Sequence, residues 1–441
     1  MPARQPIDLL LLPRWLIPIE PVVDQVLEDH ALVVDGGRIV DILPADFARQ
    51  SYAPRETIEL PRHAVLPGFV NAHTHAAMSL MRGLADDLAL MDWLQNHIWP
   101  AEAKHVGKGF CADGVRLAAA EMIRGGTTCF SDMYFFPDAT AEVAVEAGLR
   151  AVIGLVVMDF PTAWAQNWEE YLHRGLGVYD RVRGQALLSA AFAPHAPYTV
   201  SDAPLRRIRE LATELNLPVH MHVHETAGEV DAAVASGGKR PWQRLRELDL
   251  LGEDFVAVHM TQLSDDEIAE AGRLGVSVVH CPESNLKLAS GFAPVAKLLA
   301  AGVNLALGTD GAASNNDLDM LGELRTAALL AKAVSGDAQA LPAAAALRMA
   351  TLGGARAFGL ENQIGSLLRG KSADFCAIDL DHPATQPVYN VISQIVYAAG
   401  RDQVSDVFVA GRALLRNGQL QTLDQAAVLA RAREWRDRLR A

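Results

Sequence analysis

The sequence is poor in cysteine, and its four cysteines form no C-x-x-C pair. This scarcity excludes the disulfide framework that holds small secreted domains together. We therefore expect Cys111, Cys129, Cys281 and Cys376 to be buried, reduced thiols of a cytoplasmic protein. Half of the residues are hydrophobic and 21% are charged, which is ordinary for a globular chain with a sizeable core.

Positive charge is also scarce, because 39 lysines and arginines face 53 aspartates and glutamates and the formal net charge is −14. No local cluster of basic residues stands out. This balance argues against binding to nucleic acid and against binding to an anionic membrane surface. We expect the partner to be a small molecule.

Long apolar runs are missing as well. The N-terminal stretch MPARQPIDLLLLPRWLIPIE is interrupted by Pro13 and Arg14, and it lacks the apolar segment and cleavage site of a signal peptide. No segment elsewhere has the length and hydrophobicity of a membrane span. These features again predict a cytoplasmic location.

The two ends of the chain carry similar β-rich patterns that differ from the middle. Residues 31–43, ALVVDGGRIVDIL, predict a hairpin, and residues 404–415, VSDVFVAGRALL, repeat its pattern. We expect residues 1–60 and 369–441 to build one small β-sandwich domain, with a final helix at the end of the chain.

Between the ends, short apolar segments alternate with amphipathic segments of helical period. The apolar segments lie at 64–73, 127–134, 150–157, 186–195, 218–223, 254–260, 276–282 and 303–310. Eight hydrophobic strands that alternate with helices are typical of a (β/α)8 TIM barrel, which needs about 250 residues. We assign residues 61–368 to a catalytic barrel. The alternative, a doubly wound open sheet, lacks a glycine-rich dinucleotide fingerprint after its first strand.

Histidine gathers where the predicted strands end. Of the 14 histidines, eight lie at these ends: His73, His75, His195, His220, His222, His224, His259 and His280. In a barrel, chemistry occurs at the C-terminal ends of the strands, and here the eighth strand adds Asp310. A lone histidine at such a place is most often an ordinary packed residue, but several on one rim predict a metal site.

His73 and His75 lie two residues apart on the first strand and therefore point to the same face. Imidazole nitrogens together with one carboxylate suit Zn²⁺, with Fe²⁺ as the alternative. Barrels of this type that hold two metal ions bridge them with a carboxylated lysine near the end of strand four. That strand, ALLSAAFAPHAPY, contains no lysine, so we expect one metal ion per subunit.

The fifth strand, PVHMHVHET, presents His220, His222 and His224 at alternate positions, and alternation alone makes the three equivalent. Position along the strand separates them. His220 comes early and is expected a layer below the rim, whereas His224 lies at the turn where alternation ends. His222 leaves Glu225 three residues further on, free to curl back toward the metal. We therefore expect His222 to be the ligand and the other two to support it.

Seven motifs follow one another along the chain. They are LPGFVNAHTHAAMSLMRG (66–83), MDWLQNHIWPAE (91–102), FSDMYF (130–135), PHAPYTVS (194–201), HVHETAGEV (222–230), SVVHCPESNLKLASGFAPV (277–295) and LALGTDGAASNND (305–317). In this order they resemble the amidohydrolase superfamily, and more narrowly its 5′-methylthioadenosine/S-adenosylhomocysteine deaminase family. The likeness runs from about residue 30 to about residue 415. The resemblance implies a small-molecule nucleoside as substrate and a homo-oligomer of two or more copies.

The resemblance implies four metal ligands: His73, His75, His222 and Asp310. It also implies Glu225 as the proton shuttle and His259 as the residue that steers the attacking water. Deamination of an adenine needs hydroxide at C6, a proton at N1 and a protonated leaving amine, and zinc lowers the pKa of its water from about 16 to about 7. Glu225 can carry the water's proton to N1, and Asp310 can hand the next proton to departing ammonia.

The remaining implied residues contact the substrate. Glu102 would hold the ribose hydroxyls, and Trp93 would pack on the nucleoside. His195 would touch the substrate, and His280 would sit at the purine edge or just behind it. Trp93 has an equally good interpretation as simple packing. Glu102 could be an ordinary carboxylate at a helix start, but the resemblance favours its role at the ribose. Glu225 and Asp310 would also face the reacting base.

Residues 151–170, which cover most of the third strand and the segment after it, contain no lysine or arginine. Relatives that handle S-adenosylhomocysteine well carry arginines there for its carboxylate, and burying an unpaired carboxylate is costly. We therefore expect 5′-methylthioadenosine as the best substrate, adenosine as an acceptable one and S-adenosylhomocysteine as a poor one. The alternatives are a mononuclear aminohydrolase of the same branch that acts on guanine, cytosine or a triazine, and a non-catalytic metal-binding scaffold.

Overall fold

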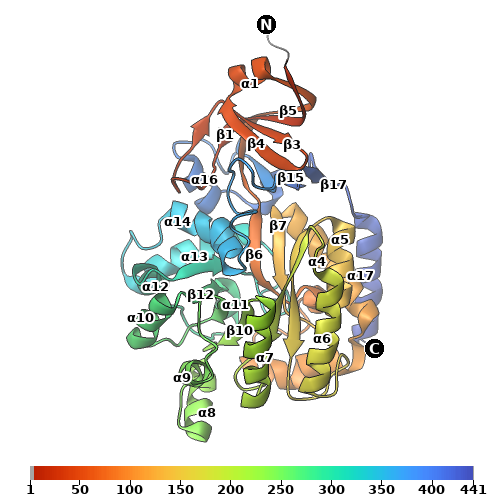
Figure 1. Ribbon diagram of the computed structural model, residues 1–441, viewed down its shortest axis with the longest axis vertical. Helices are drawn as coiled ribbons and strands as arrows, with labels where there is room; N and C mark the ends of the chain where they lie inside the picture. The colour runs from red at the N-terminus through yellow and green to blue at the C-terminus, as the bar shows by residue number, and fades with distance from the viewer. Residues whose placement is uncertain (1–3, 441) are drawn as a thin grey trace.

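The computed structural model describes residues 4–440, and a parallel barrel forms its centre (Figure 1). The barrel strands are β6 (Phe69–Thr74), β7 (Thr127–Asp132), β8 (Arg150–Val157), β9 (Leu188–Pro194), β10 (Val219–Val223), β11 (Phe255–His259), β12 (Ser277–His280) and β13 (Asn304–Leu307). They pair in chain order, and a parallel bridge between Thr74 and Asp310 joins the last strand end to the first. This order excludes the doubly wound alternative, whose strand order reverses. The predicted TIM barrel is confirmed.

Helices cover the outside of the barrel. They are α4 (Lys108–Arg124), α5 (Pro137–Ala147), α6 (Trp168–Val182), α7 (Asp202–Leu215), α8 (Ala227–Gly237), α9 (Pro241–Glu247), α10 (Asp265–Leu274), α11 (Pro282–Lys287), α12 (Val295–Ala300), α13 (Met320–Ser335), α14 (Ala343–Arg348) and α15 (Gly354–Ala357). In α7, Leu205, Ile208 and Leu211 recur at helical spacing and are buried, so one apolar stripe fixes the face that meets the barrel. Within residues 4–440, no helix has the length and hydrophobicity needed to cross a membrane.

A connection rich in short helices separates β6 from α4. It contains η1 (Ala76–Met81), α2 (Leu90–Trp93), η2 (Leu94–Ile98) and α3 (Trp99–His105). Trp93 and Ile98 are buried in this segment, whereas most of its other residues are partly or fully exposed. The segment lies at the C-terminal end of β6, where a barrel carries its site.

Strands from both ends of the chain form a second sheet above the barrel (Figure 1). Its strands are β1 (Gln5–Leu16), β2 (Leu27–Glu28), β3 (His30–Asp35), β4 (Arg38–Pro44), β5 (Tyr52–Pro67), β14 (Phe375–Asp379), β15 (Val404–Val409), β16 (Arg412–Arg416) and β17 (Gln419–Leu420). The two ends meet where β5 pairs with β14. Both predicted hairpins are present, as β3–β4 and β15–β16. The strands make one mixed nine-stranded sheet, accompanied by α1 (Ala45–Ser51) and α16 (Val391–Tyr397).

One predicted strand is divided in the structure. The apolar run 64–73 is divided at Gly68 between β5 of the small sheet and β6 of the barrel, so the small sheet extends seven residues beyond residue 60. A Cβ on Gly68 would lie 2.1 Å from the Thr128 side chain, which is why a glycine occupies the division. The final helix, α17 (Gln425–Arg440), lies against α4 of the barrel, where Trp435 Nε1 donates to Asp113 at 2.8 Å.

A buried ion pair ties the small sheet to the barrel. Arg150, at the start of β8, donates through Nε to Asp374 Oδ2 at 3.0 Å, and both side chains are almost fully buried. Burial raises the cost of leaving either charge alone, and breaking such a pair by removing one partner typically costs about 3 kcal/mol or more.

We therefore expect Asp374→Ala to lower the free energy of unfolding by about 3 kcal/mol, because the Arg150 guanidinium loses its buried partner. Urea unfolding followed by circular dichroism measures the change. Glu59→Ala is the matched control, since Glu59 pairs with Arg49 in the same region but both are exposed, and such pairs contribute about 1 kcal/mol at most. Equal midpoints for the two variants would contradict the assignment.

Candidate metal and active site

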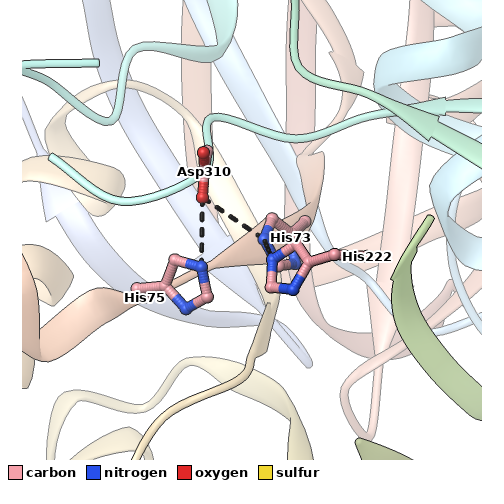
Figure 2. Close-up of side chains that lie close together, drawn as sticks. All are labelled: His73, His75, His222 and Asp310. Atoms are coloured by element: carbon pink, nitrogen blue, oxygen red, sulfur yellow. Dashed lines mark hydrogen bonds and ion pairs between the residues drawn. The ribbon is translucent and has the colours of Figure 1, made fainter. Parts of the chain in front are cut away.

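Three histidines and one aspartate meet at the C-terminal end of the barrel (Figure 2). The nearest donor atoms of His73, His75, His222 and Asp310 all lie within 4.8 Å of one another. Asp310 Oδ1 lies 3.3 Å from His73 Nε2 and 3.2 Å from His75 Nε2, and His222 Nε2 lies 3.0 Å from His73 Nε2. The structure therefore brings together the four residues that the sequence predicts as ligands, from the first, fifth and eighth strands.

The backbone at the end of β13 adopts an uncommon conformation to present Asp310. This residue has φ of 60°, in the left-handed region that non-glycine residues seldom adopt. Its N–H donates to the carbonyl of His73 at 3.0 Å, which fixes the turn. A Cβ on Gly308 would lie 2.8 Å from the backbone nitrogen of His73, so the close approach of the two strands requires glycine there.

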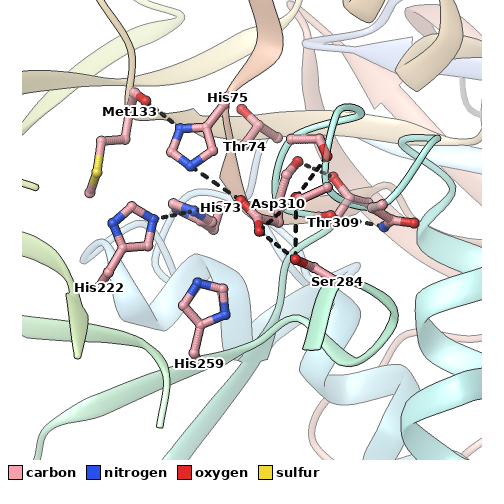
Figure 3. A network of polar contacts seen from close by, with 12 residues as sticks. His73, Thr74, His75, Met133, His222, His259, Ser284, Thr309 and Asp310 are labelled. Atoms are coloured by element: carbon pink, nitrogen blue, oxygen red, sulfur yellow. Dashed lines mark hydrogen bonds and ion pairs between the residues drawn. The ribbon is translucent and has the colours of Figure 1, made fainter. Parts of the chain in front are cut away.

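Each of the three candidate ligand histidines has a partner for its Nδ1 atom, and Figure 3 shows that of His75. His75 donates from Nδ1 to the carbonyl of Met133 at 2.6 Å, and His222 donates from Nδ1 to the carbonyl of His195 at 2.8 Å. A ring that carries a proton on Nδ1 can offer Nε2 to a metal ion once Nε2 itself is deprotonated. The Nε2 atoms of His73 and His222 lie 3.0 Å apart, close enough to bind the same cation. The donor set therefore fits a metal ion.

We call His73, His75, His222 and Asp310 the ligand group. His220 and His224 do not belong to it. His220 is buried below His73, with its Nε2 3.1 Å from His73 Nδ1, so it supports a ligand from beneath. His224 has φ of 53°, which turns it away from the shared face, and its Nε2 accepts the backbone N–H of Trp242 at 3.1 Å. Strict alternation therefore ends at His224.

The second carboxylate oxygen of Asp310 is occupied by two serines. Ser284 donates to Oδ2 at 2.6 Å (Figure 3), and Ser314 donates to it at 2.9 Å. Burial opposes ionisation of Asp310, but hydrogen bonds from His73 and His75 hold its pKa well below the ordinary value. Burial likewise opposes protonation of His75, and the pairing with Asp310 overcomes this and raises its pKa to about 9. The carboxylate is thus ionised and ready for a cation.

Glu225 and His259 lie on the same side of the ligand group. Glu225 Oε2 is 3.8 Å from His259 Nε2, and both side chains are buried. His259 Nδ1 pairs with Asn285 Oδ1 at 2.9 Å, which directs the Nε2 atom toward Glu225. Burial raises the pKa of Glu225 above its ordinary value, although the neighbouring His259 opposes that shift. A buried carboxyl with a raised pKa is suited to giving and taking protons.

The ligand group opens into a cavity of about 320 Å³, within the size range of small-molecule sites. Glu225, His259 and the predicted substrate residues Trp93, Glu102 and His195 all line it. The outer wall is largely apolar and includes Leu94, Ile98, Trp99, Met158 and Phe160. Among the lining residues there is no lysine and no arginine.

Glu102 is the acidic residue of the outer wall. It accepts a hydrogen bond from the hydroxyl of Tyr134 at 2.6 Å. Burial raises the pKa of Glu102 to about 7, against the opposing effect of Tyr134. The side chain of Trp93 is buried in the same wall, and its Nε1 has no hydrogen-bond partner within residues 4–440. Tyr134 occupies one carboxylate oxygen of Glu102 and leaves the other for a ligand, whereas Trp93 Nε1 is itself shielded from solvent.

His280 is placed differently from the other predicted substrate residues. It is 1% exposed and does not line the cavity, and its Nδ1 has no hydrogen-bond partner within the described part of the chain. Burial, together with the charge of His259, lowers its pKa to about 3, so it is neutral. His280 therefore lies behind the cavity wall in this structure, and its role at the purine edge or just behind it stays a prediction.

The sequence alone missed several residues of the site. Tyr134, Ser284, Asn285 and Ser314 hold Glu102, Asp310 and His259 through the contacts given above. These four residues all lie inside the motifs that carry the family resemblance. The motifs marked these positions, but a motif does not say which atom a side chain reaches.

Comparison with known proteins identifies the family. Residues 64–414 match the amidohydrolase family. The chain is 48% identical to the 5-methylthioadenosine/S-adenosylhomocysteine deaminase of Saccharophagus degradans, over all of this chain and 99% of that protein. It is 41% identical to the 5′-deoxyadenosine deaminase of Methanopyrus kandleri, over 94% of this chain and 96% of that one.

A solved structure is similar over almost its whole length. The zinc-bound adenosine deaminase of Xanthomonas campestris superposes with a TM-score of 0.98 at 55% identity, covering 99% of this chain and all of that one. The chain belongs to the amidohydrolase family, in the branch whose curated members are named 5-methylthioadenosine/S-adenosylhomocysteine deaminases.

Proposed function

We propose that this protein is a metal-dependent deaminase of adenine nucleosides that converts 5′-methylthioadenosine to 5′-methylthioinosine and ammonia. One observation carries the proposal. The buried carboxyl of Glu225 and the ligand group of His73, His75, His222 and Asp310 share one end of a cavity whose outer wall holds Glu102. The similar proteins named as nucleoside deaminases support the same activity.

We propose Zn²⁺ as the metal, with one ion per subunit and Fe²⁺ as the alternative. Three imidazole nitrogens and one carboxylate oxygen suit zinc, and the solved relative contains bound zinc. The fourth barrel strand, β9, contains no lysine to bridge two ions. When bound, the ion would lower the pKa of a water molecule toward about 7. Elemental analysis of the purified protein decides between zinc and iron.

The reaction needs two proton transfers, and a different carboxylate carries out each one. Glu225 takes the first proton from the attacking water and delivers it to N1 of the purine, while the water oxygen bonds to C6. His259, held by Asn285, steers the water through Nε2. Asp310 takes the second proton and passes it to the amine, so that the C6–N bond breaks and ammonia leaves. The sum is one water consumed and one ammonia released.

The cavity walls determine what the reacting base is attached to. We propose that Glu102 accepts hydrogen bonds from the ribose hydroxyls and that Trp93 packs on the nucleoside. His195 contacts the substrate at the edge of the ligand group. Its ring lies 4.9 Å from the ring of His222, and burial lowers its pKa to about 3, so it acts as a neutral imidazole.

The apolar outer wall favours a methylthio group over a charged tail. S-adenosylhomocysteine carries a carboxylate that would enter a cavity lined by no basic side chain, and desolvating an unpaired carboxylate is costly. A panel of purified nucleosides tests the substrate order. We expect efficiency, as kcat/KM, to fall from 5′-methylthioadenosine to adenosine to S-adenosylhomocysteine. Equal or higher efficiency on S-adenosylhomocysteine would overturn this order.

The raised pKa of Glu102 predicts a pH-dependent KM. Because burial raises that pKa to about 7, lowering the pH through 7 protonates the carboxylate and removes a hydrogen-bond acceptor from the ribose site. We expect the KM for 5′-methylthioadenosine to rise below about pH 7, and the Glu102→Gln variant to lose this dependence. Initial rates measured from about pH 5.5 to about pH 8.5 check it, because this range spans the titration of Glu102. An unchanged KM profile in the variant would exclude Glu102 as the titrating group.

The homo-oligomeric state and the cytoplasmic location stay predictions from the sequence. Size-exclusion chromatography with light scattering measures the first, and fractionation of the source cells measures the second.

A further inference from the structure

The loop that carries Glu225 is held by an acidic residue of the following helix. Glu229 lies in the first turn of α8, and its carboxylate accepts the backbone N–H of His224 at 3.2 Å and that of Glu225 at 2.7 Å. Within residues 4–440, these two N–H groups donate to no other acceptor. One side chain therefore satisfies both donors of the loop.

This arrangement differs from ordinary helix capping. In α10 of the same chain, Glu267 returns its carboxylate to the N–H of the capping residue Ser264, as a capping box requires. In α8, Thr226 caps the helix in the usual way by accepting the N–H of Glu229 at 3.2 Å. The Glu229 carboxylate passes this capping residue and binds the two residues before it. It therefore supports the loop as well as the helix.

The loop needs that support because its backbone is strained. His224 has φ of 53°, and a bulky residue in this region costs about 1 to 3 kcal/mol. Thr261 holds the opposite side of the loop, where its hydroxyl donates to the carbonyls of Glu225 at 2.7 Å and His224 at 3.2 Å. Glu229 thus binds the N–H groups of His224 and Glu225, and Thr261 binds their carbonyls. Together these contacts fix the direction of the Glu225 side chain.

We propose that Glu229 is a positioning residue for the proton shuttle: by binding the N–H groups of His224 and Glu225, it holds the Glu225 carboxyl in place for proton transfer. This inference rests on the proposed function. Glu229 does not line the cavity and is not part of the ligand group, so its removal leaves substrate contacts and metal donors intact.

Turnover of the Glu229→Ala variant tests the proposal. We expect kcat for 5′-methylthioadenosine to fall by about 10- to 100-fold, because a misplaced catalytic group costs up to about 100-fold. We expect KM and metal content to stay within about twofold of the wild-type values, because kinetic comparisons of variants resolve differences of about that size. Asp231→Ala, on an exposed position of the same helix, is the matched control and keeps full activity.

A second comparison separates positioning from a general structural effect. In the Glu225→Gln background there is no proton shuttle to position, so we expect Glu229→Ala to cause no further loss of turnover. An equal loss in both backgrounds, a loss confined to KM, or unchanged kcat in the single variant would each overturn the proposal.

Hydrogen exchange keeps this test independent of the reaction. Amides of residues 224 and 225 are expected to exchange faster in Glu229→Ala than in the wild type or in Asp231→Ala, as measured by mass spectrometry. Unchanged exchange would show that Glu229 does not hold the loop. If the wild-type protein does not deaminate 5′-methylthioadenosine, the proposed function fails, and faster exchange would still assign Glu229 to the loop.

Discussion

Replacing Glu225 with glutamine is expected to lower kcat for 5′-methylthioadenosine by about a thousandfold, while the protein keeps its metal. Glutamine has nearly the same shape, but its amide neither takes the proton of water nor delivers one to N1. Loss of general acid–base catalysis costs about 10²- to 10⁴-fold. The four donors, His73, His75, His222 and Asp310, are untouched, so the metal content is unchanged.

Steady-state kinetics and elemental analysis of the same preparation measure both quantities. Glu214→Gln, an exposed substitution of the same type on α7, is the control and is expected to behave as the wild type. A Glu225→Gln protein that retains about a tenth or more of the wild-type activity would contradict the role of Glu225. That threshold is about 100-fold above the remaining activity that we expect.

Replacing His222 with alanine is expected to remove metal and activity together. His222 is the donor that β10 contributes, and its Nε2 lies 3.0 Å from that of His73. Without it, three donors from two strands remain, and metal affinity is expected to fall more than about 100-fold, beyond the loss that follows removal of an outer hydrogen-bond partner. Added zinc at high concentration is expected to restore little turnover.

The control for this variant is His173→Ala, which removes an exposed histidine outside the ligand group. Its metal content and kcat are expected to equal those of the wild type. A His222→Ala protein that still binds one equivalent of zinc tightly would contradict the assignment, because the ligand group would then have to exclude His222.

The barrel was predictable because its signal is periodic and repeated. Eight apolar segments with helices between them leave few architectures, and the structure contains all eight strands in chain order. The meeting of His73, His222 and Asp310 was also predictable, since the ends of parallel strands converge on one rim. Position along the strand likewise placed His220 below the rim and His224 at the turn.

The supporting contacts were not predictable, because most of them end on the backbone. His75 and His222 are oriented by the carbonyls of Met133 and His195, and a carbonyl carries no residue-specific signal. Glu229 binds two backbone N–H groups, so in the sequence it resembles any acidic residue at a helix start. The division of the first apolar run at Gly68 was missed since hydrophobicity is continuous across it.

Strand-end reasoning left two places open for His280, at the purine edge or just behind it. It occupies a strand end like the other histidines, yet it lies outside the cavity wall. At the end of a strand, one side chain can face the cavity while its neighbour is buried behind the wall. Strand β12 ends at His280 itself, before the chain continues into α11. Strand position alone therefore did not reveal whether this ring reaches the ligand.

The most direct test of the central claim is the conversion of 5′-methylthioadenosine by the purified, zinc-loaded protein. The ultraviolet spectrum reports the change from adenine to hypoxanthine, and an ammonia assay run in parallel gives the stoichiometry. The account predicts one ammonia per nucleoside converted, with activity lost on chelation and regained with zinc. An unchanged nucleoside, alongside ammonia release from guanine, cytosine or a triazine, would contradict it.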